Sequence, residues 1–107
     1  MSLDIYLMET SPHSVFALNI THNLTDMAKE AGIYKHLWRP EASGIKKARQ
    51  LIKPLSEALG LLESDPERFK KFNPDNGWGD YDGLVAFVRA YIDACIRFPK
   101  ANIRISR

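Results

Sequence analysis

The sequence predicts a single α+β domain over residues 1–107, in which a small antiparallel sheet packs against three to four helices. Two observations carry this expectation. Strand-like stretches lie near both ends of the chain, at 3–8, 15–20 and 102–106. Apolar residues recur at helical spacing throughout the segment between them. Such an order predicts that the last strand lies beside the first, with the helices on one face of the sheet.

The first two strands are expected to form an antiparallel hairpin. Leu3, Ile5 and Leu7 alternate with more polar neighbours, which is typical of a half-buried strand. The loop at 10–14 contains a proline and interrupts the alternation. The stretch VFALNI (15–20) is rich in strand-forming residues and supplies the second strand.

Two helical stretches follow the hairpin. The first has apolar residues at i, i+3, i+4 and i+7 from Leu24, with Gly32 at its C-terminal end and Thr21 or Asn23 as its cap. The spacing over 33–38 predicts one further helical turn, which stops before a proline.

The longest periodic stretch covers 45–62. Its apolar stripe continues in phase past Pro54, which predicts one kinked helix. Ser64 or Asp65 is expected to cap a short helix after it, because a proline follows in the first turn. The last helix has its apolar stripe over 84–95 and is expected to start from Asp80 or Asp82.

Composition restricts the classes of function. Net charge is only +2, from 15 basic and 13 acidic residues, and we therefore expect no nucleic-acid partner. Cys95 is the single cysteine, which excludes an internal disulfide, fits a reducing cytoplasm and is expected to be a buried, inert thiol. The N-terminus does not resemble a signal peptide, and no segment approaches the length of a membrane helix.

Catalytic motifs are missing from the sequence. It contains no nucleophile elbow, phosphate-binding loop or zinc-protease motif, and His13, His22 and His36 are too irregularly spaced for a helical metal pair. We expect no catalytic residue, no metal and no cofactor. A hydrolase that uses His22 with Asp26 is the third-ranked hypothesis.

The stretch NITHN (19–23) is the first candidate for ligand binding. It places Asn19, His22 and Asn23 where a strand becomes a helix, and such junctions often hold phosphate or carboxylate groups. The alternative is that this junction only caps the helix.

Two tryptophans supply the other candidates. Trp38 could stack on a base beside Arg39, which could bind a phosphate, although Trp38 also continues an apolar pattern. In the loop FNPDNGWGDYDG (72–83), Asn76 precedes a Trp78 that two glycines flank, an arrangement that a helix start alone does not require. For both tryptophans the alternative, which we favour, is packing in the core.

Several motifs together resemble a small family of uncharacterised bacteriophage and prophage proteins. They are MSLDIYL, NITHNL, MAKEAGIY, LWRPE, FNPDNGWGDY and the closing ISR, and they span almost the whole chain. The resemblance implies an accessory protein acting in the cytoplasm of a bacterial host, and it supplies no functional residue.

From these observations we expect a non-enzymatic phage binding protein. Its first expected role is counter-defence by sequestering a nucleotide-like small molecule, with the candidate residues above as the site. The alternative is an inhibitor of a host protein, which would dock through the basic helix face around Lys46, Lys47, Arg49 and Lys53 or through a strand edge. Homo-oligomerisation stays open.

Overall fold

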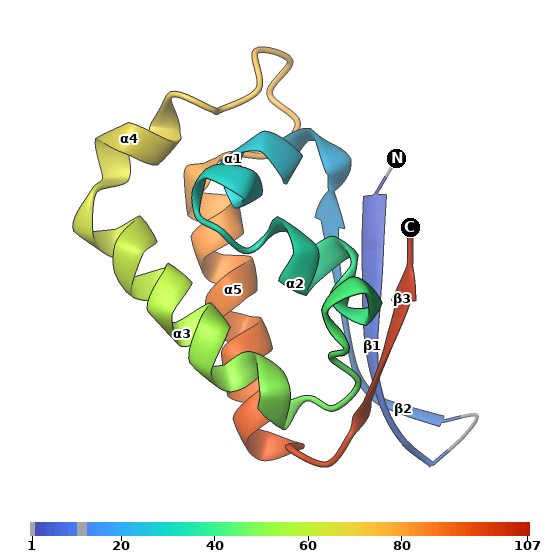
Figure 1. Ribbon diagram of the computed structural model, residues 1–107. Helices are drawn as coiled ribbons and strands as arrows, with labels where there is room; N and C mark the ends of the chain where they lie inside the picture. Colours follow the sequence, from blue (N-terminus) through green and yellow to red (C-terminus); the bar gives the residue numbers. More distant parts are fainter. Residues whose placement is uncertain (1, 11–12) are drawn as a thin grey trace.

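The computed structural model describes residues 2–10 and 13–107 and confirms the α+β architecture (Figure 1). One three-stranded antiparallel sheet is covered on one side by the helices. The elements in chain order are β1 (Ser2–Thr10), β2 (His13–Thr21), the 3-10 turn η1 (His22–Leu24), α1 (Thr25–Glu30), α2 (Tyr34–Trp38), the 3-10 turn η2 (Pro40–Ser43), α3 (Arg49–Ser64), α4 (Pro66–Lys70), α5 (Tyr81–Arg97) and β3 (Asn102–Ser106).

The sheet has the order β2-β1-β3, so the C-terminal strand lies beside the first strand, as predicted. Both pairings are antiparallel. Asp4 pairs with Ser106 on one side and with Asn19 on the other, which places the start of β1, the end of β2 and the end of β3 at the same end of the sheet.

Alternation along β1 creates the buried face of the sheet. Leu3, Ile5 and Leu7 are fully buried, and they pair with Ile20, Leu18 and Phe16 of β2 on the same face. Helices α3 and α5 pack against each other over this face (Figure 1). The opposite face carries no helix, so the side chains that alternate with the core positions remain partly exposed.

The amphipathic stripe of α5 forms much of the helical side of the core. Its buried members are Tyr81, Leu84, Phe87, Val88, Tyr91, Ile92, Ala94 and Cys95. The prediction of a buried thiol is confirmed, because Cys95 is fully buried and burial raises its pKa to about 12. Pro54 lies inside α3, which is one helix as predicted.

The predicted start of α3 was wrong, and the predicted side-chain cap of α4 does not form. Helix α3 begins at Arg49 and not near residue 45, because the preceding residues pair with β3: the Lys46 carbonyl accepts from the Ile103 amide at 2.9 Å. Helix α4 starts as predicted, with Asp65 in the N-cap position and Pro66 in the first turn, but Asp65 makes no side-chain cap bond and the Ser64 hydroxyl donates to the Leu61 carbonyl.

Candidate functional site

Trp78 is the most exposed large apolar side chain among the described residues, with 70% of its surface accessible. It lies in the loop between α4 and α5, which projects from one end of the molecule (Figure 1). The favoured interpretation of Trp78 as a core residue is therefore wrong. A tryptophan left in water loses the large gain that its burial would give, so its exposure is informative.

Trp38, in contrast, is a core residue. It is 2% exposed, its indole Nε1 donates to Nδ1 of His22 at 2.8 Å, and its ring stacks on Tyr34 with centroids 5.6 Å apart. These contacts make Trp38 unavailable for stacking on a ligand. The same hydrogen bond gives His22 a structural partner. The nitrogen that accepts from Trp38 therefore cannot act as a base toward a substrate.

A hollow of about 510 Å³ lies beside Trp78. Its lining residues are Ser2, Asn19, Thr21, Asn23 and Trp78. The start of β1, the end of β2, the turn η1 and the α4–α5 loop thus each contribute a side chain. Three of the predicted ligand-binding residues, Asn19, Asn23 and Trp78, meet in this one hollow although Trp78 is 55 residues from Asn23 in sequence.

Glycine at position 79 allows the loop to approach this closely. Gly79 has φ +97°, and a Cβ atom there would lie 2.6 Å from Cγ2 of Thr21 and 3.1 Å from Cγ of Leu24. The absence of a side chain at this position therefore lets the loop backbone rest against the β2–η1 junction. This contact positions Trp78, the preceding residue, beside the hollow.

Two asparagines hold the backbone of Trp78 beside the hollow. Nδ2 of Asn23 lies 3.4 Å from the Trp78 carbonyl oxygen, and Oδ1 of Asn76 accepts from the Trp78 amide at 2.9 Å. Asn76, predicted as a ligand residue, thus holds the backbone of Trp78 and is not part of the lining. Thr21 caps the turn η1, because its hydroxyl accepts from the Asn23 amide at 3.2 Å, whereas α1 has no side-chain cap. The same junction also lines the hollow.

Asn19 lines the hollow, and two neighbours hold its side-chain amide. Its Nδ2 donates to Oγ of Ser2 at 2.9 Å and to Oδ1 of Asp4 at 2.6 Å, which uses both of its N–H groups. Its Oδ1 makes no hydrogen bond to the described part of the chain. The side chain is therefore oriented by its neighbours and keeps a free carbonyl oxygen.

The predicted phosphate ligand, Arg39, does not belong to this hollow. It is exposed beyond the end of α2, and no lysine or arginine is among the lining residues. The site accordingly offers an aromatic face, amide groups and a hydroxyl without a cation to neutralise phosphate. This combination suits an uncharged planar ring that has its own hydrogen-bonding edge.

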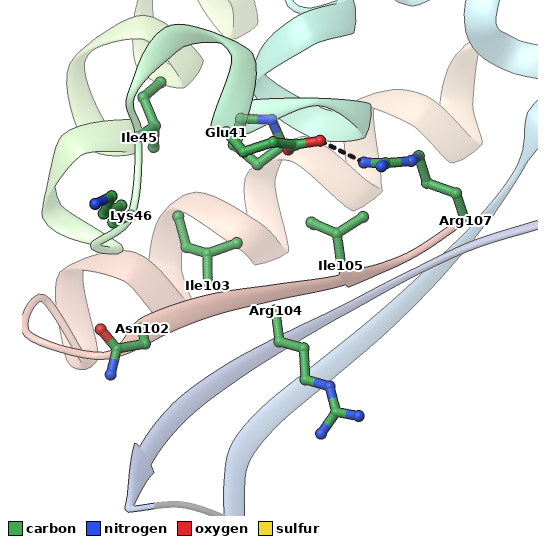
Figure 2. Close-up of a pocket in the computed structure, with 9 residues that line it drawn as sticks. Glu41, Ile45, Lys46, Asn102, Ile103, Arg104, Ile105 and Arg107 are labelled. Carbon is green, nitrogen blue, oxygen red and sulfur yellow. Dashed lines mark hydrogen bonds and ion pairs between the residues drawn. The ribbon is translucent and has the colours of Figure 1, made fainter.

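A second hollow, of about 520 Å³, lies between β3 and the segment 40–46 (Figure 2). Ile45, Ile103 and Ile105 form its apolar surface, and an ion pair between Glu41 and Arg107 at 2.7 Å closes one end. A backbone hydrogen bond at Glu41 and the nearby Arg107 lower the pKa of that carboxyl group. Sequence reasoning predicted β3 but not this hollow, since nothing in the pattern shows which loop faces the strand edge.

Side chains that could bind a metal do not gather in one place. Among residues 2–10 and 13–107, no three or more His, Cys, Asp or Glu side chains are grouped so that they could hold a metal ion. In the same part of the chain, no helix has both the length and the apolar character that crossing a bilayer requires.

Comparison with protein-family models, with curated proteins and with solved structures found no match to this chain. The resemblance to phage and prophage proteins consequently stays a prediction from the motifs.

Proposed function

We propose that the protein is a small, non-enzymatic binding protein whose site is the hollow beside Trp78. The observation that carries this proposal is the exposure of Trp78 next to two oriented asparagines. The ligand is a nucleotide-like small molecule, bound by its base. In the setting that the motif resemblance implies, the protein sequesters such a molecule in the cytoplasm of a bacterial host as part of a phage counter-defence.

The chemistry of the lining explains the choice of a base. Stacking of a nucleobase on an aromatic side chain contributes about 1–3 kcal/mol and is available to any base, because every base has a π-face. Asparagine amides can meet the donors and acceptors on the edge of a base, and the free Oδ1 of Asn19 selects for a donor. The Asp4 carboxylate, which accepts a hydrogen bond from Nδ2 of Asn19, also favours a hydrogen-bond donor on the ligand.

The lack of a lining cation leads to a specific expectation. A phosphate group gains no charge-assisted hydrogen bond in this hollow. We therefore expect a nucleoside and its 5′-monophosphate to bind with dissociation constants that differ by less than about tenfold, which corresponds to about 1.4 kcal/mol.

Tryptophan fluorescence can measure this binding directly. Titration with the four common nucleosides and their monophosphates should quench the exposed Trp78, while the buried Trp38 contributes a constant background. Trp78→Ala should abolish the change, and Trp78→Phe should retain part of it because a smaller aromatic face remains. Phe72→Ala is the matched control, since Phe72 is an exposed aromatic residue near the same loop but not part of the lining.

Two results would overturn the proposal. One is that no nucleoside or nucleotide changes the fluorescence of the folded protein at millimolar concentration. The other is that Trp78→Ala, measured by the thermal shift that each ligand produces, binds as well as the parent protein.

A further inference from the structure

Seven basic residues of this chain come from two segments that contain no acidic residue, 42–56 and 94–106. We call them the basic end; they are Lys46, Lys47, Arg49, Lys53, Arg97, Lys100 and Arg104. The segments are far apart in the chain, so the sequence alone does not show that they belong together.

Backbone hydrogen bonds join the two segments at the start of α3. The Ala48 amide donates to the Ala101 carbonyl at 2.9 Å, and the Arg49 amide donates to the Pro99 carbonyl at 3.0 Å. Nζ of Lys47 lies 3.4 Å from the Lys100 carbonyl oxygen. Figure 1 shows the start of α3 and the end of α5 at the same end of the molecule, remote from the α4–α5 loop.

None of the seven forms an ion pair with any described residue. The ion pairs of the structure involve other cations, namely Arg68, Lys70, Arg89 and Arg107. With seven positive charges assigned to the basic end, the remainder of the chain has eight basic and 13 acidic residues, a balance of −5. The net charge of +2 therefore conceals an uneven distribution of charge along the chain, although Glu41, Glu57 and Asp93 directly flank the two segments.

The basic end is not built as a pocket for one phosphate ion. Acceptors within the protein already satisfy the amides before α3: Oε1 of Gln50 accepts from the amides of Lys46 and Lys47 at 2.8 and 2.9 Å. The next two amides are bonded to the 99–101 segment. The available donors are thus the side chains, which spread over the segment before α3, the start of α3, the end of α5, the turn after it and β3. Arg104 is directed away from Ile103 and Ile105 (Figure 2).

The composition of the basic end favours nucleic acid over an acidic protein surface as its partner. The centres of protein interfaces are poor in lysine and rich in aromatic anchors. Four of these seven cations are lysines, and Ile96 is the single large apolar residue of the segment 94–106 that is well exposed, at 58%. Long unpaired cations without an apolar centre are typical of contacts to the phosphate backbone of nucleic acid.

We propose that the basic end binds the phosphate backbone of nucleic acid without reading its sequence. This proposal is independent of the site beside Trp78 and replaces the expectation drawn from net charge. That expectation used the summed charge of the whole chain. A nucleic acid interacts mainly with the charges near its contact surface, because electrostatic interactions decay within about 10 Å at 0.1 M salt.

The salt dependence of binding to a fluorescent DNA duplex of about two helical turns, about 20 base pairs, tests the proposal. If all seven cations contact phosphates, log K against log salt has a slope of about −6, and fewer contacts give a shallower line. The triple variant Arg49→Glu, Lys53→Glu, Lys100→Glu should reduce the magnitude of this slope by about 3 and weaken binding at least tenfold at about 50 mM salt. The corresponding triple glutamine variant repeats the test with a smaller change of charge.

A second triple variant, Lys35→Glu, Arg39→Glu, Lys71→Glu, is the matched control. These three residues are exposed, lie outside the basic end and change the net charge by the same amount. This control should keep the slope of the parent protein, and circular dichroism verifies that each variant is folded. The proposal is overturned if the parent does not bind the duplex at about 50 mM salt, if both triple variants lose the same affinity, or if polyglutamate binds more tightly than DNA.

Discussion

The substitution Gly79→Ala tests the contact that holds the Trp78 loop against the rest of the domain. In the structure Gly79 has φ +97°, and an added Cβ would lie 2.6 Å from Cγ2 of Thr21. Cγ and Cδ1 of Leu24 would lie 3.1 and 3.2 Å from the same Cβ. Gly77, two residues earlier, has φ +75°, and a Cβ atom added there would have no neighbour within 4 Å. The substitution Gly77→Ala therefore measures the cost of a side chain at positive φ without a steric clash.

The expected loss of stability at Gly79 has two parts. A side chain at such a positive φ costs about 1–3 kcal/mol. Two carbon atoms prefer a separation of about 3.5–4.0 Å, so the contact with Thr21 requires a shift of about 1 Å. Forcing an extra methyl group into a packed site costs a further ~1–3 kcal/mol. Gly77→Ala should show the first part alone.

Thermal and urea unfolding of both variants measure these terms. For a chain of this size, about 1 kcal/mol corresponds to about 4 °C in the melting temperature. Gly79→Ala should therefore melt about 10 °C or more below the parent protein. The melting temperature of Gly77→Ala should lie between those of the parent protein and Gly79→Ala. Because the loop carries Trp78, Gly79→Ala should also weaken the nucleoside binding proposed above.

A double-mutant cycle identifies the clashing atom. Thr21→Ser removes Cγ2 and keeps the hydroxyl that accepts from the Asn23 amide. In that background Gly79→Ala should cost less, by a coupling energy of about 0.5–2 kcal/mol, with Leu24 responsible for what remains. Equal losses for Gly77→Ala and Gly79→Ala, or strict additivity with Thr21→Ser, would refute the reasoning.

Burial of individual side chains leads to three further predictions. Trp38→Ala should destabilise the domain by about 3–5 kcal/mol, whereas Trp78→Ala should change the free energy of unfolding by less than about 1 kcal/mol; equal effects in urea unfolding would contradict the assignment of core and surface. His22→Ala should cost about 1–3 kcal/mol because it leaves the partly buried indole N–H of Trp38 without an acceptor, while the exposed His13→Ala should be nearly neutral in the same measurement. Burial raises the pKa of the Cys95 thiol to about 12. The contribution of the thiol to the free energy of unfolding is therefore complete below its unfolded pKa of about 8.5 and is lost as pH rises toward 12, at up to about 1.4 kcal/mol per pH unit. A Cys95→Ala variant should show a correspondingly shallower decline in stability above about pH 9, and an unchanged slope would contradict this.

Local pattern was sufficient for most of the elements. The alternation of Leu3, Ile5 and Leu7 predicted β1 because the two faces of a strand differ in their access to water. Helical spacing predicted α5 for the same reason, and Asp80 caps it by accepting from the Gly83 amide at 2.7 Å. The start of α3 was missed, since it depends on hydrogen bonds to the 99–103 segment that no local pattern reveals.

The lining of the hollow beside Trp78 was predicted in part. Asn19, Asn23 and Trp78 line one hollow. The stretch NITHN indicated the two asparagines, and the glycines around Trp78 indicated an exposed loop, although packing of Trp78 in the core was the favoured interpretation. Arg39 and Trp38 were grouped with them because an arginine beside a tryptophan suits a nucleotide. In the structure Arg39 lies outside the lining, and the hydrogen bond to His22 fixes Trp38 in the core.

The sequence by itself determined the fold class, the order of the elements and three of the residues that line the hollow beside Trp78. Periodicity and turn chemistry are local properties, so they can be recognised in a linear chain. Only the tertiary structure decided which tryptophan is exposed and which cations share one end of the molecule. Both depend on contacts between segments far apart in sequence: the loop at Gly79 against Thr21, and the start of α3 against Pro99–Ile103.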